Sequence, residues 1–116
     1  MMNIQTTQKS FVYALRGMRR AWREEQNFRI HVLVAVMIII FAVLRRISAT
    51  AGALLALAIS MVLALELVNT ALERLSDTLS PRIHPFMGAV KDIMAAAVLI
   101  SSLGAVVVGV LVFGFL

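Results

Sequence analysis

Residues 51–65 read AGALLALAISMVLAL, and residues 66–73 continue without a break as ELVNTALE. The first part carries no charged side chain and is typical of a membrane-spanning helix. In the second part Glu66, Asn69 and Glu73 are spaced i, i+3 and i+7, so they share one helix face, which Asp77 extends. A carboxylate close to hydrocarbon costs roughly 2.5–3.5 kcal/mol, and intramembrane carboxylates usually serve a function. This polar face is the candidate functional site.

The composition is that of an integral membrane protein. Of the 116 residues, 61% are hydrophobic, and the mean hydropathy is +0.95. There is no cysteine, which excludes disulfide and thiol chemistry. The net charge is +5, but the basic residues flank apolar segments, so we expect them to face anionic lipid headgroups and not nucleic acid. The length allows one domain, residues 1–116.

Three apolar segments predict membrane spans at about 29–46, 49–79 and 87–115. The segment at about 6–27 predicts a separate amphipathic helix, because Phe11, Leu15, Met18 and Trp22 form one apolar line opposite a basic face. A helix of this kind lies in the headgroup plane of a bilayer. We therefore expect an all-α membrane protein with three transmembrane helices and an N-terminal amphipathic surface helix.

The distribution of basic residues predicts the orientation of the spans. Nine of the eleven Lys and Arg residues lie in the N-terminal segment or around the second connection, and only Arg45 and Arg46 lie in the first turn. The excess of positive charge on cytoplasmic loops places those nine residues in the cytoplasm. The polar face, Lys91 and Asp92 then lie at the cytoplasmic boundary, where ATP is available.

Lys91 and Asp92 are further candidates, because a single ammonium group near several carboxylates suits a phosphate ligand. The alternative is that Lys91 reaches for the interface and Asp92 interacts with the helix dipole. Asp77 could equally be a solvated residue at a helix end. His31 and His84 are interpreted as boundary and turn residues, since two histidines without cysteine cannot form a structural zinc site.

These segments together resemble the prokaryotic diacylglycerol kinase family, which includes undecaprenol kinases. The similarity runs in order along nearly the whole chain. Its motifs are ALRG (14–17), EEQNFRIH (24–31), ELVNTALERLSD (66–77), HP (84–85) and KDIMAAAVL (91–99). The EEQN…H form is more similar to the undecaprenol-type branch than to the diacylglycerol-type branch. One departure is the stretch 94–97, where family members often have glycine or another small residue.

The resemblance implies a homotrimer with active sites between subunits on the cytoplasmic side, and transfer of phosphate from Mg²⁺–ATP to a membrane lipid alcohol. By this resemblance Glu66 is the general base for the lipid hydroxyl, with Asn69 also on the lipid side, and Glu25 and Glu73 hold Mg²⁺. The residues expected to contact ATP are Glu25, Asn69, Glu73, Asp77, Lys91 and Asp92.

Two other classes of protein have to be weighed. A small oligomeric channel or transporter subunit needs polar groups through the whole membrane depth, whereas residues 32–44 carry none and the third segment has only Ser101 and Ser102 beyond its start. A noncatalytic membrane adaptor leaves the carboxylates and Lys91 without a purpose. The choice between undecaprenol and diacylglycerol stays open, because both present a primary hydroxyl at a similar depth.

Overall fold

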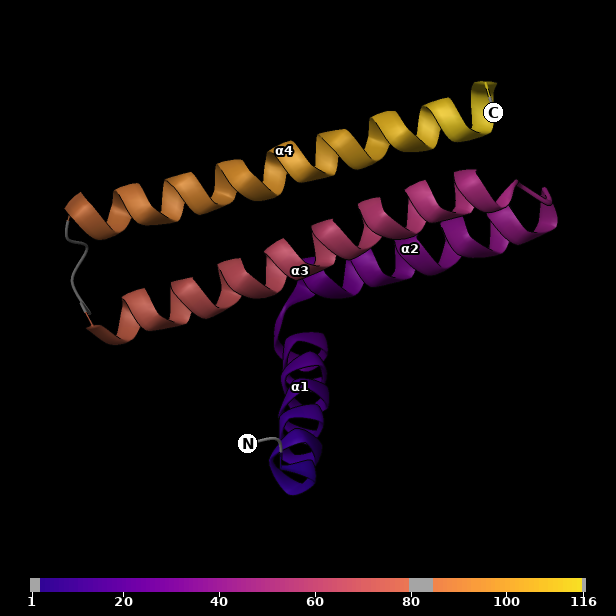
Figure 1. Ribbon diagram of the computed structural model, residues 1–116. Coiled ribbons are helices and arrows are strands. Elements are labelled where there is room, and N and C mark those ends of the chain that lie inside the picture. Colours follow the sequence, from indigo (N-terminus) through magenta and orange to yellow (C-terminus); the bar gives the residue numbers. More distant parts are fainter. Residues whose placement is uncertain (1–2, 80–84, 116) are drawn as a thin grey trace.

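The structure is a computed structural model that describes residues 3–79 and 85–115 (Figure 1). The described parts form four helices: α1 (Ile4–Glu24), α2 (Gln26–Leu44), α3 (Ala49–Leu79) and α4 (Pro85–Phe115). In Figure 1, α2, α3 and α4 run lengthwise beside one another, and α1 leaves this group at a steep angle. His84, the first residue of the HP motif, lies outside the described residues.

Three helices are long and apolar enough to cross a membrane: α2, α3 and residues 86–115 of α4. The predicted all-helical class with three apolar spans is therefore confirmed. The 19 residues of α2 give a length of about 28 Å, close to the roughly 30 Å of a bilayer's hydrocarbon core. With 31 residues, α3 is much longer than this thickness, so part of it extends beyond the apolar layer.

The chain turns sharply between α1 and α2 at Glu25, whose backbone is extended (φ −114°, ψ 109°). The guanidinium of Arg29 stabilises this turn by donating hydrogen bonds to the carbonyl oxygens of Trp22, at 2.8 Å, and Arg23, at 2.9 Å. These carbonyls belong to the last turn of α1 and have no partner within the helix. Arg29, a residue of α2, thus caps the end of α1. The bend itself lies at Glu25, which carries a carboxylate.

The connection from α2 to α3 is short because both helix ends are capped. Arg46 has a positive φ of 52°, and its N–H donates to the carbonyl of Val43 while the N–H of Ile47 donates to that of Ala42. This pair of bonds is the Schellman arrangement, in which glycine usually occupies the left-handed position. The hydroxyl of Ser48 then accepts from the N–H of Ala51 at 3.1 Å and caps the start of α3.

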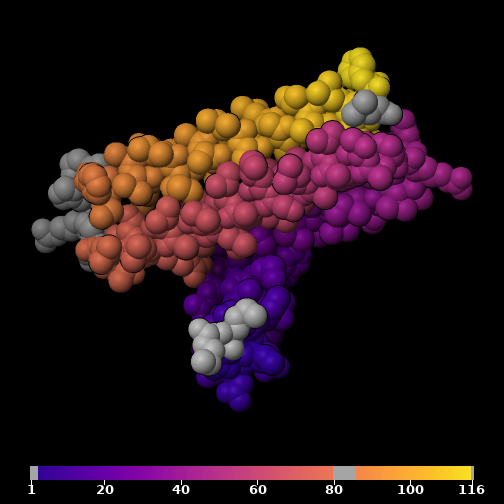
Figure 2. Space-filling model, in the orientation of Figure 1, coloured from indigo at the N-terminus to yellow at the C-terminus, as the bar shows by residue number. Residues whose placement is uncertain are grey.

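The buried core lies at the end of the molecule where α2 turns into α3. Ala42, Ala51, Leu55 and Val112 form its centre, so α4 returns to this end and packs against both other helices. The rings of Phe41 and Phe113 are 4.9 Å apart. Figure 2 shows α4 lying along α3, with α1 standing out from the rest. The small residues in this core allow close approach of the helix backbones.

Most large apolar side chains point outward. Met37 of α2, Leu57 of α3, and Ile100 and Val106 of α4 are examples that are all more than half exposed. In water such a surface would drive aggregation, whereas in a bilayer lipid chains cover it at no cost. The distribution is that of a membrane protein, and it also leaves room for contacts with further copies of the chain.

Candidate functional site

The polar residues of α3 converge on a small cavity near the start of α2. The cavity has a volume of about 260 Å³. It is lined by three carboxylates, two amides, one hydroxyl and three apolar side chains: Glu25, Glu66, Glu73, Asn27, Asn69, Thr70, Phe28, Ala95 and Val98. The i, i+3, i+7 spacing on α3 therefore does bring Glu66, Asn69 and Glu73 to one space, and Glu25 joins them from the α1–α2 turn.

Glu66 is the most buried carboxylate of this group, with a side chain only 8% exposed. It contacts His31 of α2, whose Nδ1 lies 2.5 Å from Oε1 of Glu66. The two groups do not have the alignment of a regular hydrogen bond, and the pair is a close polar contact. Sequence reasoning assigned His31 no role, because spacing within one helix gives no information on which residue of another helix lies at the same depth.

Two oxygen atoms in the cavity wall are left without a partner among the described residues. Oε2 of Glu66 and Oδ1 of Asn69 are both buried, and neither has a hydrogen-bond partner there. An unsatisfied buried oxygen costs about 1–3 kcal/mol, and more when it is charged. Such atoms are expected where a ligand supplies the missing donor or cation.

Glu25 is engaged by a basic residue of α3. The guanidinium of Arg74 contacts Oε1 of Glu25 at 2.9 Å and a carboxylate oxygen of Glu24 at 2.5 Å. These ion pairs tie the end of α1 to the part of α3 that lies beyond Glu73. Arg74 was not among the predicted site residues, and the pairing of a helix end with a helix 49 residues away in sequence could not be read from any local pattern.

Lys91, Asp92 and Asp77 lie outside the cavity. Lys91 of α4 pairs with Asp77 of α3, with Nζ 2.6 Å from Oδ1. Ala95 and Val98, which follow Lys91 on the same face of α4, do line the cavity. Lys91 therefore lies one helical turn before the cavity-lining Ala95 on the same face of α4, while Asp92 is exposed.

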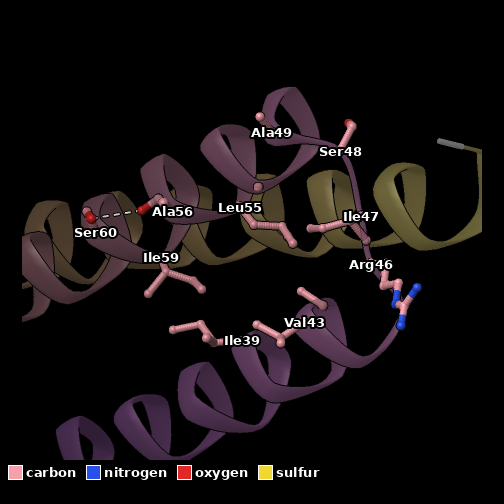
Figure 3. A pocket seen from close by; sticks show the side chains of 12 residues that line it. Ile39, Val43, Arg46, Ile47, Ser48, Ala49, Leu55, Ala56, Ile59 and Ser60 are labelled. Atoms are coloured by element: carbon pink, nitrogen blue, oxygen red, sulfur yellow. Dashed lines mark hydrogen bonds between the residues drawn. The ribbon is translucent and has the colours of Figure 1, made fainter.

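A larger cavity of about 600 Å³ lies between α2 and α3 at the opposite end of the molecule. Figure 3 shows Ile39 and Val43 of α2 facing Leu55 and Ile59 of α3, with Arg46 at the edge and pointing away from these four side chains. No acid, amide or histidine lines this cavity, whose polar side chains are those of Arg46, Ser48 and Ser60. The smaller polar cavity is the candidate active site.

The donor set of the polar cavity fits a hard divalent cation with phosphate ligands. Mg²⁺ prefers carboxylate and amide oxygens and usually takes only one or two protein carboxylates. Glu25, Glu73 and the unpartnered Oδ1 of Asn69 offer such oxygens. Within residues 3–79 and 85–115, no cluster of three acidic or histidine residues is close enough to hold a metal without further ligands. Phosphate oxygens of a substrate and water would supply the remaining ligands.

Comparison with known proteins agrees with this chemistry. Residues 12–113 match the family described as prokaryotic diacylglycerol kinase. A diacylglycerol kinase of Synechocystis sp. is 43% identical over 86% of this chain, and the chain spans 58% of the length of that relative. The undecaprenol kinase of Bacillus subtilis is 35% identical, with 90% of this chain and 85% of the relative covered. The diacylglycerol kinase of Escherichia coli is 30% identical, with 85% and 81% covered.

The family match reaches into all four helices, and its range contains the positions of the acidic, amide and basic residues around the polar cavity. The buried carboxylate, the paired acidic residues and the apolar spans thus occur in the sequence context of one known group of enzymes. The chain belongs to the prokaryotic diacylglycerol kinase family, a family of membrane-bound lipid kinases.

Proposed function

We propose that the protein transfers the γ-phosphate of ATP to the primary hydroxyl of a membrane lipid alcohol, either undecaprenol or diacylglycerol, at the cytoplasmic membrane surface. The observation that carries this proposal is that one cavity contains carboxylates in two different environments. Glu66 is buried and has an oxygen without a partner. Glu73, which follows Glu66 on α3, and Glu25, from the α1–α2 turn, line the same cavity.

Depth along α3 separates the two substrates. The residues before Glu66 are apolar, and Glu73 follows it by seven residues, or about 10 Å along the helix. A lipid hydroxyl sits at the headgroup level, next to hydrocarbon, so Glu66 is the carboxylate that it reaches. ATP approaches from water, where Glu73, Glu25 and the nearby Lys91 meet its phosphates.

The chemistry asks little covalent work of the protein. Phosphoryl transfer depends on positioning and on neutralising charge on the phosphate oxygens. In this proposal Glu66 accepts the proton of the lipid hydroxyl, and Asn69 hydrogen-bonds beside it. Glu25 and Glu73, with Asn69, would hold Mg²⁺, which when bound neutralises the phosphate oxygens. Lys91 contacts a phosphate after leaving Asp77, with Asp77 and Asp92 on the nucleotide side.

The functional unit in this proposal is a homotrimer whose N-terminal helices lie on the membrane surface. The cavity volume of about 260 Å³ is below the roughly 300–1,000 Å³ of sites for small ligands, so one chain leaves both substrates partly uncovered. Phe11, Leu15, Met18 and Trp22 on α1 are exposed and form the apolar side that would enter the headgroup layer. A detergent-corrected mass of three times 12.7 kDa would support the trimer, and a monomer mass would contradict it.

Transfer of labelled phosphate from ATP to lipid in vesicles tests the function. We expect the wild type to label undecaprenol or diacylglycerol when the two are assayed side by side, and Glu66→Gln and Glu73→Gln to lose turnover while remaining folded. Glu24→Gln is the matched control, because Glu24 is an acidic neighbour of Glu25 that does not line the cavity. No labelling of either lipid by the wild type would overturn the proposal.

A further inference from the structure

His31 contacts Glu66, the candidate general base, without lining the cavity. Its Nδ1 is 2.5 Å from Oε1 of Glu66, yet His31 is not among the residues that line the cavity, whereas Glu66 is. The imidazole is 35% exposed and the carboxylate only 8%. His31 thus contacts Glu66 without lining the cavity, and we expect it to affect a ligand there through that carboxylate.

This contact gives the two oxygens of Glu66 different surroundings. Oε1 faces the imidazole, while Oε2 is buried without a hydrogen-bond partner in the described part of the chain. A buried acceptor without a donor is unfavourable, so Oε2 favours the arrival of a hydroxyl group. Because Oε1 lies 2.5 Å from a ring on another helix, the space around this oxygen is restricted, which limits rotation of the carboxylate.

The other charged groups near this contact are occupied elsewhere or have the same sign as Glu66. Glu25 and Glu73 line the same cavity, and Arg74 of α3 is held by Glu24 and Glu25. Arg29, on the same helix as His31, is bonded to carbonyls of α1. From α4 the cavity receives only Ala95 and Val98. Among the described residues, His31 is thus the one basic side chain that contacts Glu66.

We propose that His31 is a positioning residue for phosphoryl transfer, holding Glu66 so that Oε2 accepts the proton of the lipid hydroxyl. The inference rests on the proposed kinase function. In the step, the lipid oxygen bonds to the γ-phosphorus as its proton moves to Oε2. The bond from that phosphorus to the bridging oxygen breaks, and ADP leaves with the electron pair. His31 touches none of the reacting atoms and acts by fixing the base.

Two substitutions at His31 separate positioning from a general structural role. His31→Ala removes the contact, and we expect kcat to fall about 10²-fold, the scale of a 1 Å misplacement of a reacting group, with the KM for ATP unchanged. In His31→Asn the amide nitrogen takes the place of Nδ1 and donates to Oε1, so we expect most of kcat to return. Ile30→Ala is the matched control, because Ile30 is the preceding residue of α2 and is 47% exposed.

A double-mutant cycle in the same lipid vesicles tests whether His31 acts through Glu66. If it does, adding His31→Ala to Glu66→Gln causes no further loss of turnover, whereas an independent role makes the two losses multiply. Multiplying losses, a wild-type kcat in His31→Ala, or a raised KM for ATP at unchanged kcat would overturn the inference. So would a folded His31→Asn variant as slow as Glu66→Gln.

The lipid-kinase activity of the wild type distinguishes a failure of the proposed function from a failure of the proposed role of His31. If it labels no lipid, the kinase function is wrong and the role of His31 falls with it. If it labels lipid and Glu66→Gln does not, an active His31→Ala contradicts the positioning role alone. Should His31→Ala fail to fold, as judged by elution volume and helical circular dichroism, the turnover of His31→Asn decides by itself: near-wild-type turnover supports the role, and loss of turnover contradicts it.

Discussion

Glu66 has no tolerance for displacement in the proposed reaction, because its free oxygen has to meet a hydroxyl at one depth. Glu66→Asp withdraws the carboxylate by one methylene group, and we expect kcat to fall about 10²-fold while the KM for ATP changes less than about twofold. Steady-state labelling of lipid at varied ATP measures both constants. Glu24→Asp shortens an exposed carboxylate outside the cavity and serves as the control. A wild-type kcat in Glu66→Asp would show that Glu66 is not the base.

In the proposed site Arg74 would compete with Mg²⁺ for the carboxylate of Glu25, since its guanidinium lies 2.9 Å from that group. The side chain of Arg74 is 44% exposed and that of Glu25 is 31% exposed. Exposed ion pairs contribute at most about 1 kcal/mol to stability. We therefore expect Arg74→Ala to lower the Mg²⁺ concentration for half-maximal turnover by up to about fivefold. A magnesium titration at saturating ATP measures this, with Arg74→Lys as the charge-preserving control. A higher magnesium requirement would mean that Arg74 orients Glu25 and does not compete for it.

At this scale the sequence predicts which residues of one helix meet, but not their partners on other helices. The periodicity of α3 brought Glu66, Asn69 and Glu73 to one cavity, and this follows from 3.6 residues per turn alone. The contacts of Glu66 with His31 and of Glu25 with Arg74 depend on how far one helix slides along another. That offset is set by the packing of the helices against each other, and it cannot be deduced from the spacing of residues within one helix.

The α2–α3 turn carries strain that substitution can remove. Arg46 has φ 52°, a conformation that costs a residue with a Cβ roughly 1–2 kcal/mol more than glycine, part of which glycine loses again through its freedom in the unfolded chain. We expect Arg46→Gly to stabilise the protein by about 0.5–1 kcal/mol, measured as a higher Tm in detergent. Arg45→Gly is the control, because Arg45 has φ −80° and gains nothing from glycine. A lower Tm for Arg46→Gly would contradict this.

Helix ends differ in how well the sequence marks them. The end of α2 and the start of α3 lie beside Arg45, Arg46 and Ser48, where charge and a capping residue interrupt apolar sequence. The break between α1 and α2 at Glu25 has no glycine or proline near it that would predict a helix end. It depends on Arg29 reaching back to the carbonyls of α1, a tertiary contact that local preferences do not contain.

The arrangement of the whole molecule indicates where the membrane boundary runs. His31, near the start of α2, contacts Glu66, so the two mark the same depth. Residues 67–79 of α3 then extend about 20 Å farther, beside the start of α4 and away from the apolar layer (Figure 1). Along α3 the polar cavity begins where the uncharged stretch 51–65 ends, which is the position that the proposed reaction between a lipid and a water-soluble nucleotide requires.

In the predicted topology Lys9 and Arg45 lie on opposite sides of the membrane, because the span α2 separates them. The chain has no cysteine, so single substitutions give clean labels. We expect Lys9→Cys to react with a membrane-impermeant maleimide only in opened or inverted vesicles, and Arg45→Cys to react from outside intact cells. Gel-shift labelling before and after lysis measures both. Reaction of both positions from the same side would contradict the predicted topology.

The hydrogen bonds from Arg29 to Trp22 and Arg23 couple the first turns of α2 rigidly to the last turn of α1. A span changes its tilt when the surrounding bilayer thickens or thins. Through these bonds we expect such a tilt to be passed on to the end of α1 and to Glu25, against the ion pair that ties Glu25 to Arg74 of α3. The acyl-chain length of the host membrane is thereby expected to influence turnover through the position of Glu25.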